Sequence, residues 1–144
     1  MPKNPLDAYK QNRKASLSGR DIEVAVLEKA AMNFRMLFNQ WDESSKDFNK
    51  ELDEAVKFNQ RVWDIFQSDW KSEQCQLPKE IRQNLLSLSV YVRKSSLDVV
   101  ANPTQQKITT LIEINENIAS GLSEGQKSSG SSSESGGPSI NAET

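Results

Sequence analysis

The chain has 144 residues, with 18 basic and 20 acidic side chains, one cysteine and no histidine. A single cysteine excludes an intrachain disulfide, and the absence of histidine removes the usual general base of a catalytic site. Without Lys127 and the three glutamates beyond Leu122, the chain carries equal numbers of acidic and basic residues, which argues against attachment to nucleic acid or anionic membrane by charge alone. We therefore expect a protein that acts by contact and is not an enzyme.

Other features narrow the class further. No apolar run approaches the roughly 20 residues that a membrane span needs, and residues 1–7 contain no apolar stretch like that of a secretory signal. The sequence contains no metal-ligand motif and no glycine-rich phosphate loop, so we expect no metal and no cofactor. Cys75 lies in a polar stretch before a proline and is expected to have no role. These observations predict a cytoplasmic protein without a small-molecule substrate.

The spacing of glycine and proline predicts an all-α fold. Between Arg20 and Ser120 there is no glycine, and the only prolines are Pro78 and Pro103. Because these two residue types interrupt helices most strongly, the segment should form long helices divided by the two prolines. A capping-box pattern begins at Ser18, and Gly121 lies where a C-terminal cap would be expected. We predict a compact bundle of five helices, over residues 5–15, 18–41, 45–70, 78–100 and 104–120.

From Ser123 onward the composition changes to serine, glycine and glutamate. Such a tract buries too little apolar surface to offset the entropy of ordering it. The sequence therefore predicts two regions: a helical domain over residues 1–122, and a flexible, disordered tail or linker over residues 123–144.

Helical periodicity predicts the core. In the third helix, one seam repeats at spacings of four and three residues. Its members are Phe48, Leu52, Ala55, Asn59, Val62 and Phe66. Further apolar residues widen this seam to about half the circumference, more than the ~100° of an ordinary surface helix. The helix therefore either lies centrally or has apolar surface left for a partner. Asn59, and Asn115 in the last helix, interrupt apolar stripes and are expected to be buried amides with hydrogen-bond partners.

Two helices carry apolar residues on a second face. In the fourth helix Leu86, Val90 and Leu97 lie opposite the stripe that contains Leu85 and Val92. A helix with two apolar faces must bury both or leave one for a partner, and both possibilities remain open. In the second helix, Met32 and Met36 lie away from the core stripe, where they either form an adaptable contact surface or pack beneath the first helix. These five residues are the predicted partner-binding site.

Several segments together resemble the FlaF family of flagellar biosynthesis regulators from alphaproteobacteria. They follow the family's order and extend over about residues 6–122. The segments are Ala8–Lys10, Leu17–Glu23, Val26–Ala31, Asn59–Gln67, Leu77–Ser89 and Ile112–Leu122. The Ser/Gly-rich tail lies outside the resemblance.

The resemblance implies a small cytoplasmic protein needed to make and export flagellin, with no catalytic residues to carry over. Flagellin, through a terminal amphipathic segment, is the expected partner, with the regulator FlbT or the export apparatus as further candidates. The expected role is that of a secretion chaperone and positive regulator of flagellum assembly. The alternative is post-transcriptional control of flagellin mRNA, directly or through FlbT. Direct RNA contact would draw on a basic patch of Lys10, Arg13, Lys14 and Arg20.

Overall fold

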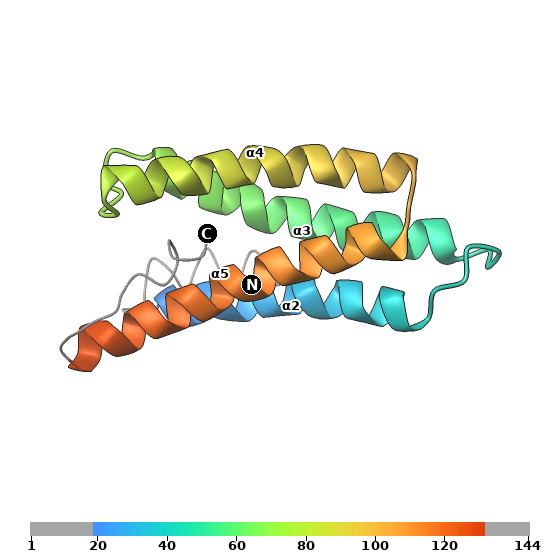
Figure 1. Ribbon diagram of the computed structural model, residues 1–144, viewed down its shortest axis with the longest axis horizontal. Coiled ribbons are helices and arrows are strands. Elements are labelled where there is room, and N and C mark those ends of the chain that lie inside the picture. The colour runs from blue at the N-terminus through green and yellow to red at the C-terminus, as the bar shows by residue number, and fades with distance from the viewer. Residues whose placement is uncertain (1–18, 132–144) are drawn as a thin grey trace, which may run out of the picture.

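The computed structural model describes residues 19–131, and the side chains of residues 21–123. Every regular element in this range is an α-helix, which confirms the all-α prediction. Residues 19–131 form four helices: α2 (Gly19–Asn39), α3 (Phe48–Lys71), α4 (Lys79–Ala101) and α5 (Gln105–Ser131) (Figure 1). The helix expected over residues 5–15 and the capping residue Ser18 lie outside the described residues.

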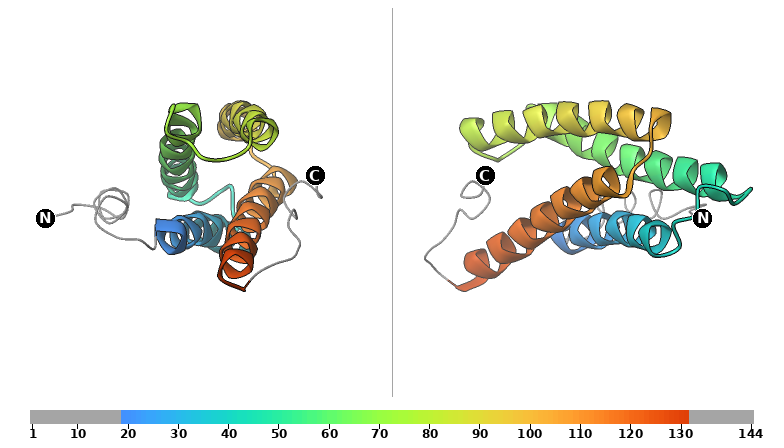
Figure 2. Two further views of the ribbon diagram at one scale, coloured as in Figure 1. Left: turned by 90° about the vertical axis from the view of Figure 1, so that its left-hand side faces the viewer. Right: turned by 45° about the vertical axis from the view of Figure 1, so that its right-hand side comes forward.

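The four helices form an antiparallel bundle in which each helix packs on two others. α2 packs on α5 and α3, and α4 packs on α3 and α5. Seen nearly end on, they occupy the four corners of the bundle, with α2 and α4 at opposite corners (Figure 2). The contact of α2 with α5 is the most extensive, whereas α4 and α5 lie close near their connection and then diverge (Figure 1). Consequently much of the circumference of α4 has none of the other three described helices packed on it.

The connection between α2 and α3 is longer than the sequence predicts, because a local turn replaces the expected helix ends. The backbone N–H and the hydroxyl of Ser44 both donate to Asp42 Oδ1, at 3.0 Å and 2.6 Å. These two bonds, the hydroxyl bond first, lower the pKa of the Asp42 carboxyl. An aspartate that bonds the backbone two residues ahead favours a turn over a helix. Hence α2 ends at Asn39 and not at Trp41, and α3 begins at Phe48 and not at residue 45.

The two prolines divide the chain close to where the sequence places the divisions. Pro78 directly precedes α4, with φ of −56°, and its carbonyl accepts the N–H of Arg82 at 2.9 Å. The α4–α5 connection contains Pro103, and Thr104 Oγ1 accepts the N–H of Lys107 at 3.2 Å at the start of α5. Pro78 is thus the residue before the helix and not its first helical residue. The predicted boundaries of the connection between α4 and α5 are correct to within one residue.

The predicted end of the last helix is wrong. α5 does not stop at residue 120 with Gly121 as its cap, but continues through Gly121 to Ser131. A glycine inside a helix costs only about 1 kcal/mol relative to alanine, less than the packing of neighbouring apolar residues contributes. Ala119 is buried and Leu122 packs against the core on either side of Gly121. The first nine residues assigned to the flexible tail are therefore helical.

Gly121→Ala tests this helix end by the sign of its effect. Because Gly121 lies inside α5, alanine should raise the free energy of unfolding by roughly 0.5–1 kcal/mol. Urea denaturation followed by circular dichroism measures the change. A left-handed capping glycine would respond in the opposite way, so a loss of stability would contradict the continuous helix.

The core lies along the axis of the bundle and follows the predicted stripes. All six residues of the α3 seam are buried, and so are Val56, Trp63 and Trp70 beside it. Trp63 and Trp70 meet edge to face with ring centroids 5.9 Å apart, and Phe66 stacks on Trp70 at 5.6 Å. Full burial of a large apolar side chain contributes about 1.5–3 kcal/mol, so this cluster is a main source of stability. α3 occupies one corner of the bundle and does not lie centrally, and its broad apolar arc packs between its two neighbouring helices, α2 and α4.

A polar layer crosses the core between α3 and α5. Asn115 Nδ2 donates to Asn59 Oδ1 at 2.7 Å, and Trp63 Nε1 donates to Asn115 Oδ1 at 2.8 Å. All three side chains are buried. Asn59 Nδ2 has no hydrogen-bond partner among the described residues. The prediction that both asparagines are buried amides is confirmed, and the structure shows that they bond each other.

Candidate partner-binding surfaces

α4 is an amphipathic helix with a second apolar stripe on its outer side. Leu85, Val92 and Val99 are buried in the core, as predicted. On the opposite side, Val90 is 47% exposed and Leu97 is 69% exposed. These two residues thus have the apolar exposure that a partner-binding surface requires, and internal burial of the whole second stripe is excluded.

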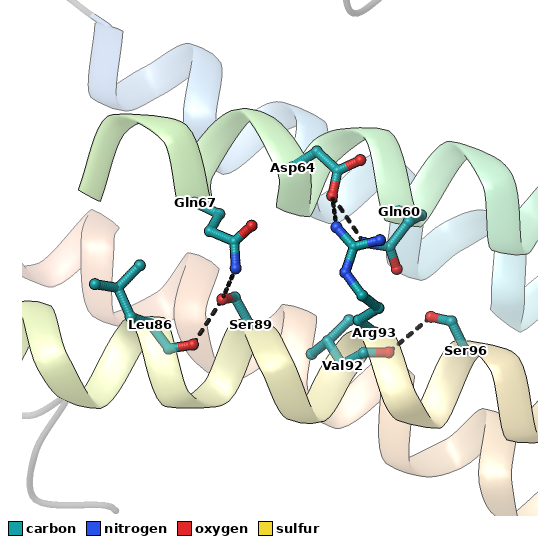
Figure 3. Close-up of polar contacts among 8 residues, drawn as sticks. All are labelled: Gln60, Asp64, Gln67, Leu86, Ser89, Val92, Arg93 and Ser96. Carbon is teal, nitrogen blue, oxygen red and sulfur yellow. Dashed lines mark hydrogen bonds and ion pairs between the residues drawn. The ribbon is translucent and has the colours of Figure 1, made fainter. Parts of the chain in front are cut away.

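Polar contacts along one flank hold α4 against α3 (Figure 3). Arg93 Nη2 lies 2.6 Å from Asp64 Oδ1, which also accepts a bond from Gln60 Nε2 at 2.9 Å. One turn away, Gln67 Nε2 donates to Ser89 Oγ at 2.9 Å, and Ser89 Oγ donates to the Leu86 carbonyl at 2.7 Å. These contacts fix the rotation of α4 about its own axis, so that the second stripe faces outward.

The three α4 residues of the predicted partner-binding site differ in how far they are exposed. Leu86 is only half-buried and packs against the core, whereas Val90 and Leu97 are exposed. Sequence reasoning missed Val100, which is 45% exposed. Its position three residues after Leu97 places it on the same face, but it is also the last residue of the helix that the sequence predicts. We define the outer face of α4 as Leu86, Val90, Leu97 and Val100.

Met32 and Met36 lie on a different surface. They are 52% and 54% exposed on α2. Met32 lines a groove of about 580 Å³ between α2 and α5. The other residues of this groove are Glu28, Arg35, Glu116, Ala119, Ser120 and Ser123. We call it the α2–α5 groove. The alternative that the methionines pack beneath the helix expected over residues 5–15 involves residues that the structure does not describe.

An ion pair spans the α2–α5 groove. Arg35 Nε and Nη2 both donate to the carboxylate of Glu116, at 2.9 Å and 2.7 Å. Both side chains are about half exposed, so the pair contributes at most about 1 kcal/mol to stability. Because α2 and α4 occupy opposite corners of the bundle (Figure 2), the five predicted site residues form two separate surfaces and not one.

Within residues 21–123, no group of three or more cysteine, aspartate or glutamate side chains is placed to hold a metal ion. Cys75 is half-buried and packs against the core. None of the four helices, over their described residues, is long and apolar enough to cross a membrane.

The fold and its surfaces place the chain among antiparallel helical-bundle proteins with apolar residues exposed on their outer surface. Its family is specific: the model of the family described as flagellar protein FlaF matches residues 5–122, and the chain belongs to that family. The match covers α2, α3, α4 and most of α5, which confirms the resemblance inferred from the sequence. No curated protein and no solved structure matches the chain. The protein is therefore related to the flagellum.

Proposed function

We propose that this protein is a non-enzymatic, cytoplasmic flagellin-binding protein that promotes flagellin synthesis and escorts flagellin to export. Membership of the flagellar protein FlaF family supports the flagellar context. The observation that carries the proposal is the outer face of α4, where Val90 and Leu97 expose large apolar side chains on a rigid helix. A contiguous exposed apolar face on a soluble bundle is typical of a protein–protein contact site.

The escort role suits the chemistry of an unassembled filament subunit. The terminal segments of flagellin are expected to be amphipathic and to lack a core of their own before assembly. Such a segment gains about 25 cal/mol for each Å² of apolar surface that it buries, and it loses part of this gain in becoming ordered. Binding is then moderate in strength and reversible. Reversibility is required because the flagellin must be released for export.

The α2–α5 groove is proposed as a second contact site. Met32 lines this groove and Met36 lies one turn farther along α2, and both offer flexible, polarizable side chains that adapt to different partners. Since this groove and the outer face of α4 lie on separate surfaces, one molecule can hold flagellin on α4 while a second protein contacts α2. FlbT or the export apparatus is the candidate for that second protein.

Titration calorimetry with full-length monomeric flagellin tests the proposed function. We expect binding with a dissociation constant in the submicromolar to micromolar range, a negative heat-capacity change from apolar burial, and a complex that elutes together from a sizing column. Flagellin polymerised into filaments is the control and should not bind, because its terminal segments are then buried. If monomeric flagellin gives no heat at several temperatures and no co-eluting complex, the proposed function is wrong.

A further inference from the structure

The outer face of α4 carries positive charge beside its apolar residues and no negative charge. At 100° per residue, four basic residues of α4 fall within about 60° of Leu97 around the helix axis: Lys79, Arg82, Arg93 and Lys94. The two acidic residues of α4, Glu80 and Asp98, lie about 100° away from Leu97. The charged residues of α4 that border the apolar stripe are therefore all basic.

Three of these basic residues, Lys79, Arg82 and Lys94, have no acidic partner among the described side chains. Arg93 pairs with Asp64 on α3, and Asp98 pairs with Lys107 on α5 at 3.0 Å. By contrast, no ion pair within residues 21–123 involves Lys79, Arg82 or Lys94. The bundle thus neutralises Arg93 and Asp98 and leaves three positive charges, those of Lys79, Arg82 and Lys94, beside the apolar stripe.

Positive charge and apolar surface are unevenly distributed along α4. Lys79 and Arg82 lie in its first turn, whereas Val90 lies at its midpoint and Leu97 and Val100 lie in its second half. The first turn also has the positive end of the helix dipole, and no side chain at the N-cap position bonds to its free N–H groups. The N-terminal end of the outer face therefore attracts negative charge, and its C-terminal half offers apolar surface.

We propose that the flagellin segment bound on α4 is an amphipathic helix whose apolar stripe is bordered by acidic residues, with its most acidic end beside Lys79 and Arg82. This inference rests on the proposed function, because it specifies the chemistry of the bound segment. Opposite charges flanking an apolar contact fix the direction and register of a docked helix. A second copy of this chain fits poorly, because its own outer face of α4 carries no acidic residues to border the docked apolar stripe.

Charge reversal on this face tests the proposal. The variant Lys79→Glu/Arg82→Glu/Lys94→Glu should bind monomeric flagellin at least about 10-fold more weakly than the wild type at 50 mM salt. At 500 mM salt the difference should shrink to less than about 3-fold, because salt screens exposed charges. The matched control Lys46→Glu/Lys50→Glu/Arg61→Glu changes net charge equally through exposed residues outside α4 and should bind like the wild type. If the reversal variant misfolds, the glutamine version of the same three positions replaces it, with an expected loss of about 3-fold or more.

The outcomes separate this inference from the function on which it rests. If flagellin binds and Leu97→Glu removes binding, but the reversal variant binds like the wild type, the acidic-helix inference is wrong and the proposed function stands. If the wild type does not bind flagellin at all, both are wrong. Two further measurements cover other occupants of the face. One tests whether the protein sediments with phosphatidylglycerol vesicles, and the other tests by light scattering whether it forms a dimer. If the wild type does either and the reversal variant does not, the inference is wrong.

Discussion

Val90→Glu/Leu97→Glu should weaken flagellin binding more than about 100-fold, while the free energy of unfolding changes by less than about 0.5 kcal/mol. Both side chains are exposed in the free protein, so glutamate there keeps its hydration and does not disturb the core. In the complex, the two carboxylates would be removed from water against apolar surface without partners, at a cost of several kcal/mol. Calorimetry gives the affinity, and urea denaturation gives the stability.

Leu86 is left out of this variant for a structural reason. It packs against the core, so a glutamate there would lower stability and binding together. The control is Met32→Glu/Met36→Glu, which adds the same two charges to exposed residues on α2. We expect this control to lower flagellin affinity less than about 3-fold. Equal losses in the two variants would contradict the assignment of flagellin to α4, and unfolding of the α4 variant would place Val90 and Leu97 in the core.

Trp63→Ala should lower the free energy of unfolding by about 3–5 kcal/mol, a large part of the 5–15 kcal/mol typical of a domain. The indole is almost completely buried and packs edge to face on Phe66 and Trp70. Its removal leaves a cavity and also removes the hydrogen bond that Nε1 donates to Asn115 Oδ1. Urea denaturation followed by circular dichroism measures the loss.

Trp63→Phe isolates the contribution of the buried hydrogen bond. Phenylalanine keeps much of the apolar volume but leaves Asn115 Oδ1 without its donor, at an expected cost of about 1–3 kcal/mol. Trp41→Phe is the matched control, because Trp41 Nε1 bonds to the exposed carboxylate of Glu43 at 3.0 Å, and its cost should stay below about 1 kcal/mol. If the two substitutions cost the same, the polar layer does not stabilise the fold.

Local sequence patterns predicted most of this fold because local forces decide those features. The absence of glycine over a hundred residues leaves helix as the favoured state, and Pro78 and Pro103 interrupt the helix whatever their tertiary surroundings. The α3 seam could be read from its spacing because a helix buries one continuous face. Asn59 and Asn115 were identified as buried for the same reason. Their mutual bond could not be predicted, since residues 56 positions apart meet only through tertiary packing.

The errors also have physical causes. Glycine commonly caps the C-terminus of a helix, but the packing of Ala119 and Leu122 outweighs the modest cost of placing Gly121 inside α5. The five predicted site residues lie on two surfaces because periodicity gives a residue's position around its own helix and not that helix's place in the bundle. For the same reason, the half-burial of Leu86 depends on neighbours that its own helix does not reveal.

The hydrogen bond between the side-chain amides of Asn115 on α5 and Asn59 on α3 also bears on the proposed binding of a partner. If α5 slid by one turn along α3, Asn59, Asn115 and the indole of Trp63 would all lose their partners in a dry interior, so only one register is tolerated. A bundle locked in this way is preorganised: it presents α4 to every ligand in a single geometry. On association, mainly the incoming chain then loses conformational entropy. Affinity can accordingly be tuned by the sequence of that chain without any remodelling of the receptor.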